Sequence, residues 1–244
     1  TERKRAETLL NQRLEDLALI NKLNDAVNHG EGLDQVAELL ASETKRIFKS
    51  QYASVYLIHP ETQALVLEQF TMPQELIARL EKLVGMQVPQ VHIPRDGDDH
   101  FNEVLKSDQG LLITGDEAVQ HWLTDFTNTG FLPAQVHPRI RKFIPAAVKL
   151  LNVKSVISIP LRAGNETLGL IEFVTEELFD EGALERLRNV RHQLAEVIVR
   201  KRAEQSLRAI NEQYRLLSEE LEERVRQRTA EVQDRYDNAP AGYH

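Results

Sequence analysis

The residues best suited to metal chemistry lie close together in one segment of the sequence. They are His92, Asp96, Asp98, Asp99 and His100. Imidazole nitrogens and carboxylate oxygens are both ligands for divalent metals. No helical or turn spacing holds these five residues in one ligand set, and Gly97 and the nearby prolines indicate a loose connection. We therefore expect a solvated loop here, with a lid over a pocket as the alternative, and no metal site.

Covalent catalysis also finds little support in the residues. The chain has no cysteine, which excludes thiolate metal sites, a cysteine nucleophile and thioether attachment of a chromophore. No Ser-His-Asp arrangement, paired-carboxylate motif or Gly-rich phosphate loop is present. His192 falls in a helical stretch, as a phospho-acceptor histidine would, but the acidic residue and Thr-Pro of that motif do not follow it. We expect His192 to be a surface histidine and the chain not to be an enzyme.

Charge and hydropathy exclude further classes of function. The sequence has 30 Lys and Arg against 38 Asp and Glu, a formal net charge of −8, which argues against nucleic acid as a partner. No apolar run approaches the roughly 18 residues that a membrane-spanning helix needs. We therefore expect a cytoplasmic protein, and a piece of a larger one.

Hydrophobic periodicity predicts the elements that position any site. Residues 1–29 lack Gly and Pro and carry one apolar stripe with helical spacing, which includes Leu10, Leu14 and Leu17. A mixed region follows, in which four segments read as strands joined in pairs by short turns. Such strands pair antiparallel rather than forming a βαβ nucleotide fold. The predicted strands are 52–58, 64–70, 153–161 and 167–175.

The last part of the chain predicts one long helix. Residues 183–239 contain no Gly or Pro, and as a helix they would extend about 85 Å. Apolar residues recur there at steps of three and four, flanked by balanced charge that is typical of a coiled coil. An extra four-residue step at Val225 is a stutter in this pattern. The seam needs a partner, most simply a second copy in parallel, and includes Leu207, Ile210, Tyr214, Leu217, Leu221 and Val225.

A family resemblance emerges in the last predicted hairpin. Residues 154–161 read KSVISIPL and residues 168–173 read LGLIEF, and this pair closely resembles the final hairpin of a GAF sensory domain. The resemblance implies an α+β fold over residues 30–182. It also implies a central antiparallel sheet, with the terminal helices on one face and a ligand pocket on the other.

The flanking segments resemble other parts of bacterial sensors. Residues 222–231 read EERVRQRTAE and look like the signalling helix between sensory modules, and residues 237–244 resemble the start of a PAS domain. The implied organisation is an N-terminal signalling helix over 1–29, the GAF-like domain, and a helical linker over 183–236. Together these resemblances imply a sensor of a two-component system, most simply a histidine kinase whose output portion lies beyond the linker.

The same resemblance places a variable pocket wall around one predicted helix. Trp122, Asp125 and Phe126 share a helical face there, and Asn128 and Phe131 follow. These five residues are candidate ligand contacts, with a role in the plain hydrophobic core as the alternative. The sequence does not identify a ligand or cofactor.

The expected function is a sensory and dimerisation module that binds a small ligand or relays a signal. A ligand-free structural relay is the alternative. Catalysis is remote, because relatives of this fold that reduce methionine sulfoxide need cysteine thiols. The residues expected to carry the dimer contact and the signal are Leu194, Ile198, Leu207, Ile210, Tyr214, Leu217, Leu221 and Val225.

Overall fold

The computed structural model describes residues 2–87, 91–128, 140–179 and 181–237. Two compact units divide the chain after Arg200, and each is described by itself. The predicted PAS start lies almost entirely outside the described residues.

A six-stranded sheet forms the centre of the first unit, with the strand order β3-β2-β1-β6-β5-β4 and every pair antiparallel. The four longer strands confirm the sequence prediction within two residues at each end. The two edge strands were not predicted, because two and four residues are too few to show an alternating pattern. The strands are β1 (Tyr52–Ile58), β2 (Leu65–Phe70), β3 (His92–Ile93), β4 (Leu111–Thr114), β5 (Ser155–Ala163) and β6 (Glu166–Thr175).

Seven helices of the described chain accompany the sheet, which confirms the predicted α+β class and GAF-like fold. Pro145 lies in the first turn of α7, where its missing N–H costs no helical hydrogen bond. The helices are α1 (Glu2–Asn28), α2 (Leu33–Phe48), α3 (Gln74–Val84), α4 (His100–Lys106), α5 (Asp116–Asn128), α7 (Ile144–Leu151) and α8 (Glu181–Asp237).

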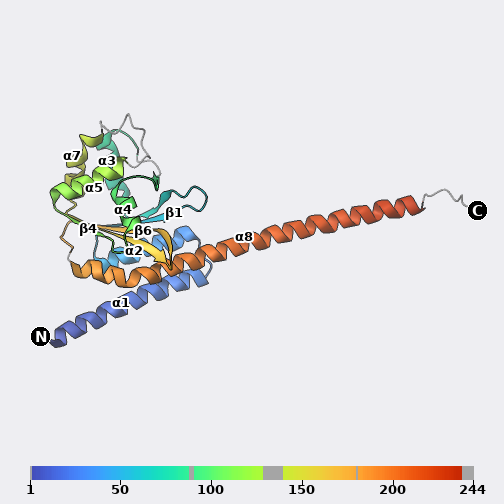
Figure 1. The fold of residues 1–244 in the computed structure, drawn as a ribbon, viewed down its shortest axis with the longest axis horizontal. Helices are drawn as coiled ribbons and strands as arrows, with labels where there is room; N and C mark the ends of the chain where they lie inside the picture. Colours follow the sequence, from blue (N-terminus) through green and yellow to red (C-terminus); the bar gives the residue numbers. More distant parts are fainter. Residues whose placement is uncertain (1, 88–90, 129–139, 180, 238–244) are drawn as a thin grey trace, which may run out of the picture. The chain divides into compact units, whose positions relative to one another are not determined.

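The helices divide between the two faces of the sheet (Figure 1). Helices α1 and α2 and residues 181–200 of α8 cover one face, where alternate side chains of the central strands point. Val55 of β1, Ile159 of β5 and Phe173 of β6 join their apolar side chains in one continuous core. Burying this much aliphatic surface, at about 25 cal/mol per Å², is the main stabilising contribution to the unit.

The opposite face of the sheet carries α3, α4, α5 and α7. Its apolar side chains form two separate clusters. One gathers around Tyr56 and Phe101, and the other around Trp122 and Val156. The same face of the sheet also carries a group of buried polar side chains, centred on Glu172.

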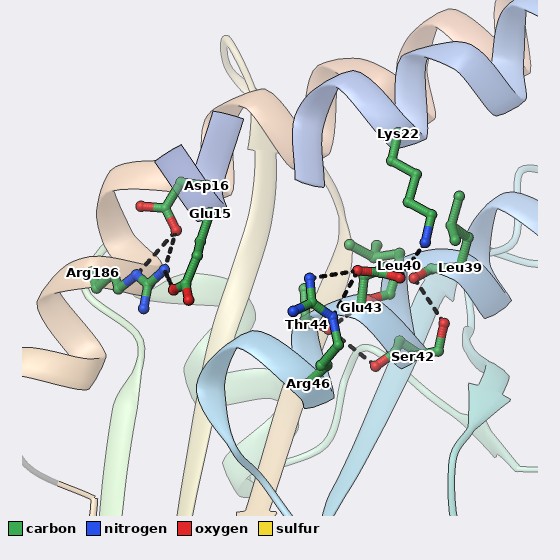
Figure 2. Close-up of polar contacts among 11 residues, drawn as sticks. Glu15, Asp16, Lys22, Leu39, Leu40, Ser42, Glu43, Thr44, Arg46 and Arg186 are labelled. Atoms are coloured by element: carbon green, nitrogen blue, oxygen red, sulfur yellow. Dashed lines mark hydrogen bonds and ion pairs between the residues drawn. The ribbon is translucent and has the colours of Figure 1, made fainter. Parts of the chain in front are cut away.

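An arginine joins the N-terminal helix to α8 (Figure 2). Arg186 of α8 donates from Nε and Nη2 to Asp16 Oδ1 at 3.0 and 2.7 Å, and from Nη2 to Glu15 Oε2 at 2.9 Å. Its guanidinium also lies 5.0 Å from the centre of the Phe48 ring. Figure 2 also shows the ion pair of Lys22 with Glu43, which ties α1 to α2. The first half of α1 is therefore held mainly by charge, since Leu9, Leu10, Leu14 and Leu17 are exposed.

Replacing Arg186 by alanine is expected to loosen the first half of α1 selectively. The bidentate contact with Asp16 is charge-assisted but partly open to solvent, so its loss should lower the opening free energy of that segment by about 1–2 kcal/mol. Hydrogen–deuterium exchange of peptides from residues 2–18 measures this. Arg224→Ala, which removes an exposed ion pair with Glu220, is the matched control and should leave that exchange unchanged. Equal exchange in the Arg186 variant and the wild type would contradict this role.

The second unit begins at Lys201, and the part described is the remainder of α8. The six predicted seam residues in it are between 46% and 69% exposed, so no described residue of this unit covers them. Arg215 lies between Glu212 and Glu219 at 2.7 and 2.6 Å, as expected of a charged helix flank. No helix in the described parts of the chain combines the length and apolar character that crossing a membrane requires.

Candidate functional site

A single carboxylate is buried at the centre of the sheet. Glu172 of β6 has no solvent-exposed surface and points to the face that carries α4 and α5. In the sheet register it pairs with Ser54 of β1 on one side and with Ser158 of β5 on the other. An isolated buried charge is strongly unfavourable, so the side chains around Glu172 decide whether this arrangement is stable.

Three donors converge on one oxygen of Glu172. Its Oε1 accepts from Ser158 Oγ at 2.5 Å, from Trp122 Nε1 at 3.2 Å and from His100 Nε2 at 3.1 Å. These donors come from β5, α5 and α4, so Glu172 fixes both helices onto the sheet. The other oxygen, Oε2, is buried and has no hydrogen-bond partner among the described residues.

A second carboxylate faces His100 from the other side. Asp125 Oδ2 accepts from the backbone N–H of His100 at 3.2 Å and lies 3.7 Å from its Nδ1. The second distance allows an ion pair but exceeds a hydrogen bond. The exposed His121, one turn before Asp125 on α5, places its Nε2 3.8 Å from the same oxygen. His100 therefore lies between two acidic groups.

The charges around the imidazole shift several pKa values. Burial alone would lower the pKa of His100, but the facing carboxylates of Asp125 and Glu172 outweigh it and raise this pKa above 6.5. Burial would likewise raise the pKa of Asp125, yet its contacts with His100 and the charge of His121 lower it. Burial and the nearby Glu172 charge raise the pKa of the Tyr56 phenol well above its ordinary value.

The stability of the domain is expected to fall as pH rises through the folded-state pKa of His100. The folded pKa is raised, so the stabilising contribution of His100 is complete below its unfolded value near 6.5 and is lost at higher pH. Asp125 acts in a separate acid range, because its lowered pKa adds stability that disappears only below about 3.8. Urea unfolding at several pH values between about 6 and 9 measures the slope. His100→Gln should flatten it, and an unchanged slope in that variant would contradict the assignment.

An open pocket of about 330 Å³ lies beside this cluster, between α4 and α5. His100 and Asp125 belong both to the cluster and to the pocket. A smaller apolar pocket of about 110 Å³ lies against α3, α5 and α7 and includes Phe126. Polar groups that converge at a concave surface are typical of a small-molecule site.

The structure brings together three of the five predicted pocket residues. Trp122, Asp125 and Phe126 all lie on α5. Trp122 donates to Glu172, and Asp125 faces His100. The ring of Phe126 lies 6.2 Å from the ring of Phe101, measured between the ring centres. Trp122 is 7% exposed and belongs to the buried core, which confirms the alternative reading of that residue. The side chain of Asn128 and the whole of Phe131 lie outside the described residues. Ligand contact by any of the five stays a prediction.

The expected loop over residues 92–100 is wrong in part. His92 pairs with Val66 as part of β3, and His100 is the first residue of α4 and only 6% exposed. Asp99 caps this helix, because its Oδ1 accepts from the backbone N–H of Asn102 at 3.0 Å. Asp96 and Asp98 are exposed, as predicted. The helix was missed because seven residues show hardly two turns of periodicity.

His192 is exposed, as predicted, and pairs with Glu196 at 3.2 Å. Leu194 and Ile198, however, are each 1% exposed within the core of the first unit. Neither side chain is available on the surface for a second copy, and their part in transmission stays a prediction.

Sequence reasoning did not single out Glu172 and Ser158, and it considered His100 only as part of a solvated loop or a lid. The signal for two of them was present, because Glu172 is the one charge inside the otherwise apolar stretch 168–174, and Ser158 breaks the apolar run of the neighbouring strand. A lone charge in a strand that is apolar on both faces indicates a buried, partnered group. The contribution of His100 depends on the tertiary fold and left no such signal.

Comparison with known families decides the identity of the fold. Residues 32–198 match the GAF domain. The chain belongs to the GAF domain family. GAF domains are typically sensory or signalling modules that can bind small ligands. No sequence among the curated proteins matches the chain.

Solved GAF-like structures show the same fold. The free methionine-R-sulfoxide reductase of Neisseria meningitidis, in complex with its substrate, is 15% identical with a TM-score of 0.53, and the match covers 79% of this chain and 90% of that one. The phycoerythrobilin-bound GAF domain of a cyanobacterial phytochrome is 14% identical with a TM-score of 0.51, over 79% and 99% of the two chains. At such identities the likeness extends to the fold alone.

Proposed function

We propose that this GAF domain is a sensory module whose ligand binds between α4 and α5, beside the buried Glu172 cluster. The observation that carries the proposal is the convergence of His100, Trp122 and Ser158 on Glu172 beneath an open pocket. A domain that served only as a spacer would gain little from a buried carboxylate, since an apolar side chain of similar size is often as stable or more so.

A polar connection runs from the proposed site to α8. Helix α4 carries His100 at its first residue, and the turn after its last residue binds two arginines of α8. Arg188 Nε donates to the carbonyl of Gln109 at 2.6 Å, and Arg191 donates to the carbonyl of Asp108. Because these hydrogen bonds join the turn to α8, a shift of α4 on ligand binding would also displace α8.

The proposed output is a parallel homodimer through residues 201–237 of α8. The row from Leu207 to Val225 supports it, because these side chains are exposed at the three- and four-residue steps of a coiled-coil seam. The stutter at Val225 offers two packings of similar energy. A ligand would select between them only through its difference in affinity for the two states.

The wider context of this module is also proposed. Resemblance of residues 222–231 to a signalling helix supports a cytoplasmic sensor of a two-component system, with a PAS domain and a histidine kinase as the simplest downstream units. The chain itself is proposed not to be an enzyme: the cysteine thiols of sulfoxide-reducing relatives have no counterpart in it.

A thermal-shift screen of a metabolite library, combined with native mass spectrometry, tests ligand binding. A ligand at saturating concentration should raise the melting temperature by several degrees through mass action, and a retained molecule should add to the mass of the chain. Asp125→Asn should remove the shift, whereas Glu61→Gln, in the exposed turn after β1, should keep it. If no compound stabilises the wild type and no mass is added, the ligand-free relay is the better account.

A further inference from the structure

The pocket between α4 and α5 is strongly acidic. Four carboxylates and one ammonium line it, so its formal charge is three negative when both histidines are neutral. Its lining residues are Asp98, Asp99, His100, Glu103, Lys106, His121 and Asp125. A pocket with this balance of charge favours a cationic ligand over a neutral or anionic one.

An unsatisfied nitrogen adds a second and independent requirement. His100 is 6% exposed, and its Nδ1 is buried without a hydrogen-bond partner among the described residues. The other ring nitrogen is already engaged by Glu172 at 3.1 Å. Nδ1 instead faces Asp125, at the lining of the pocket. Asp125 can form an ion pair with this nitrogen when it is protonated, but no described residue gives it a hydrogen bond, so a ligand could supply one.

A metal ion does not meet these requirements. In the described part of the chain, no group of three His, Asp or Glu residues has the arrangement to hold one. A primary ammonium group does meet them, because it carries three N–H donors. Nδ1 of His100 is buried in this structure, so the ammonium would have to enter between Nδ1 and the Asp125 carboxylate, which lie 3.7 Å apart. There one donor would bond Nδ1 of a neutral His100, another would bond Asp125, and the third would be left for the acidic lining of the pocket.

We propose that this pocket binds a small molecule with a primary ammonium group, which takes the place of the proton on His100. The inference rests on the proposed function and names the ligand class of that same site. In the empty pocket the proton on His100 balances Asp125 and Glu172. In the occupied pocket the ammonium does so, and Nδ1 becomes a hydrogen-bond acceptor.

Proton release follows from this exchange. Lys106 and His121 line the pocket together with His100, and the carboxylates around the imidazole are those of Glu172 from β6 and Asp125 from α5, at its two ring nitrogens, and of Asp99 and Glu103 from its own segment. These carboxylates favour the protonated imidazole, whereas an adjacent ammonium disfavours it. Binding should therefore release up to one proton to the buffer, and affinity should increase with pH until His100 is neutral in the free protein.

Isothermal titration of the full chain with n-butylammonium tests the proposal at about pH 7, in phosphate and in HEPES buffer, neither of which carries a primary amine. We expect one site per chain. The apparent binding enthalpy should differ between the buffers by the difference in their protonation enthalpies, multiplied by the number of protons released.

Tetramethylammonium, which has the charge but no N–H, should bind at least about tenfold more weakly, and n-butanol should not bind. His100→Gln should abolish the buffer dependence. Asp125→Asn should weaken binding about tenfold or more, and the surface control Glu61→Gln should not.

The opposite results separate the ligand class from the site itself. Equal binding of n-butanol, or unchanged affinity in Asp125→Asn, would overturn the proposal. If n-butylammonium fails but a compound without an amine stabilises the wild type and not Asp125→Asn, the ligand class is wrong and the proposed site stands. If neither binds, both fail. Should Asp125→Asn not fold by circular dichroism, the exposed Asp98→Asn carries the same test, with an expected loss of about threefold or more.

Discussion

Replacement of Glu172 by alanine is expected to lower the free energy of unfolding by about 3–5 kcal/mol. The change leaves three buried donors, from Ser158, Trp122 and His100, without their acceptor. It also leaves the imidazole of His100 without one of its two charge partners. Because native domains are stable by only about 5–15 kcal/mol, this single substitution removes a large share of the total. Urea unfolding at fixed protein concentration measures it.

Two further variants separate the carboxylate from a general effect of substitution. Glu172→Gln keeps the shape and one acceptor oxygen, so it should cost clearly less than alanine and remains measurable if the alanine variant does not fold. Glu61→Ala removes an exposed carboxylate from the turn after β1 and should change the free energy of unfolding by less than about 0.5 kcal/mol. A Glu172→Ala variant as stable as this control would show that the buried cluster does not stabilise the domain.

The double substitution Leu217→Glu and Leu221→Glu is expected to convert a dimer into a monomer. Both side chains are about half exposed in the single chain, and a parallel partner would bury them in adjacent layers of the seam. Two carboxylates from each chain would then face each other in a desolvated contact, where like charges are strongly unfavourable. Sedimentation velocity at micromolar concentration reports the change in mass.

The helix offers a matched control one residue away. Leu216 is as exposed as Leu217 but lies about 100° around the helix from it, and Gln227 projects from nearly the same face as Leu216. Leu216→Glu combined with Gln227→Glu adds the same charge outside the seam and should leave the dimer intact. A wild-type monomer, or dissociation by both double variants alike, would refute the seam.

The sheet could be predicted from the sequence because its long strands are short apolar segments, rich in β-branched and aromatic residues, that are joined in pairs by turns. Val55 and Tyr56, or Ile171 and Glu172, point to opposite faces, and each face has its own partner layer. Local pattern was also enough for α1 and α8. The edge strands and α4 were not predictable in this way, because their few residues are held by contacts with distant parts of the chain.

The site was predictable only in part for a related reason. Trp122, Asp125 and Phe126 share one helix face, and the family resemblance placed a pocket wall at that helix. The buried charges of the site come from other elements: His100 lies on α4 and Glu172 on β6, 72 residues apart in the sequence. Their approach depends on the way α4 packs on the sheet, and no local pattern contains that information. The lone charge of Glu172 in β6 and the serine in the apolar run of β5 were the usable signs.

The most direct test of the central claim is a distance measurement across the proposed dimer. The chain has no cysteine, so Ser218→Cys places a single spin label on each copy of α8 for double electron–electron resonance. The account predicts that n-butylammonium, or a compound from the screen that stabilises the wild type but not Asp125→Asn, shifts the distance distribution. It also predicts that Arg188→Ala with Arg191→Ala keeps binding but loses the shift. A saturating ligand that leaves the distribution unchanged would contradict coupling between the pocket and α8.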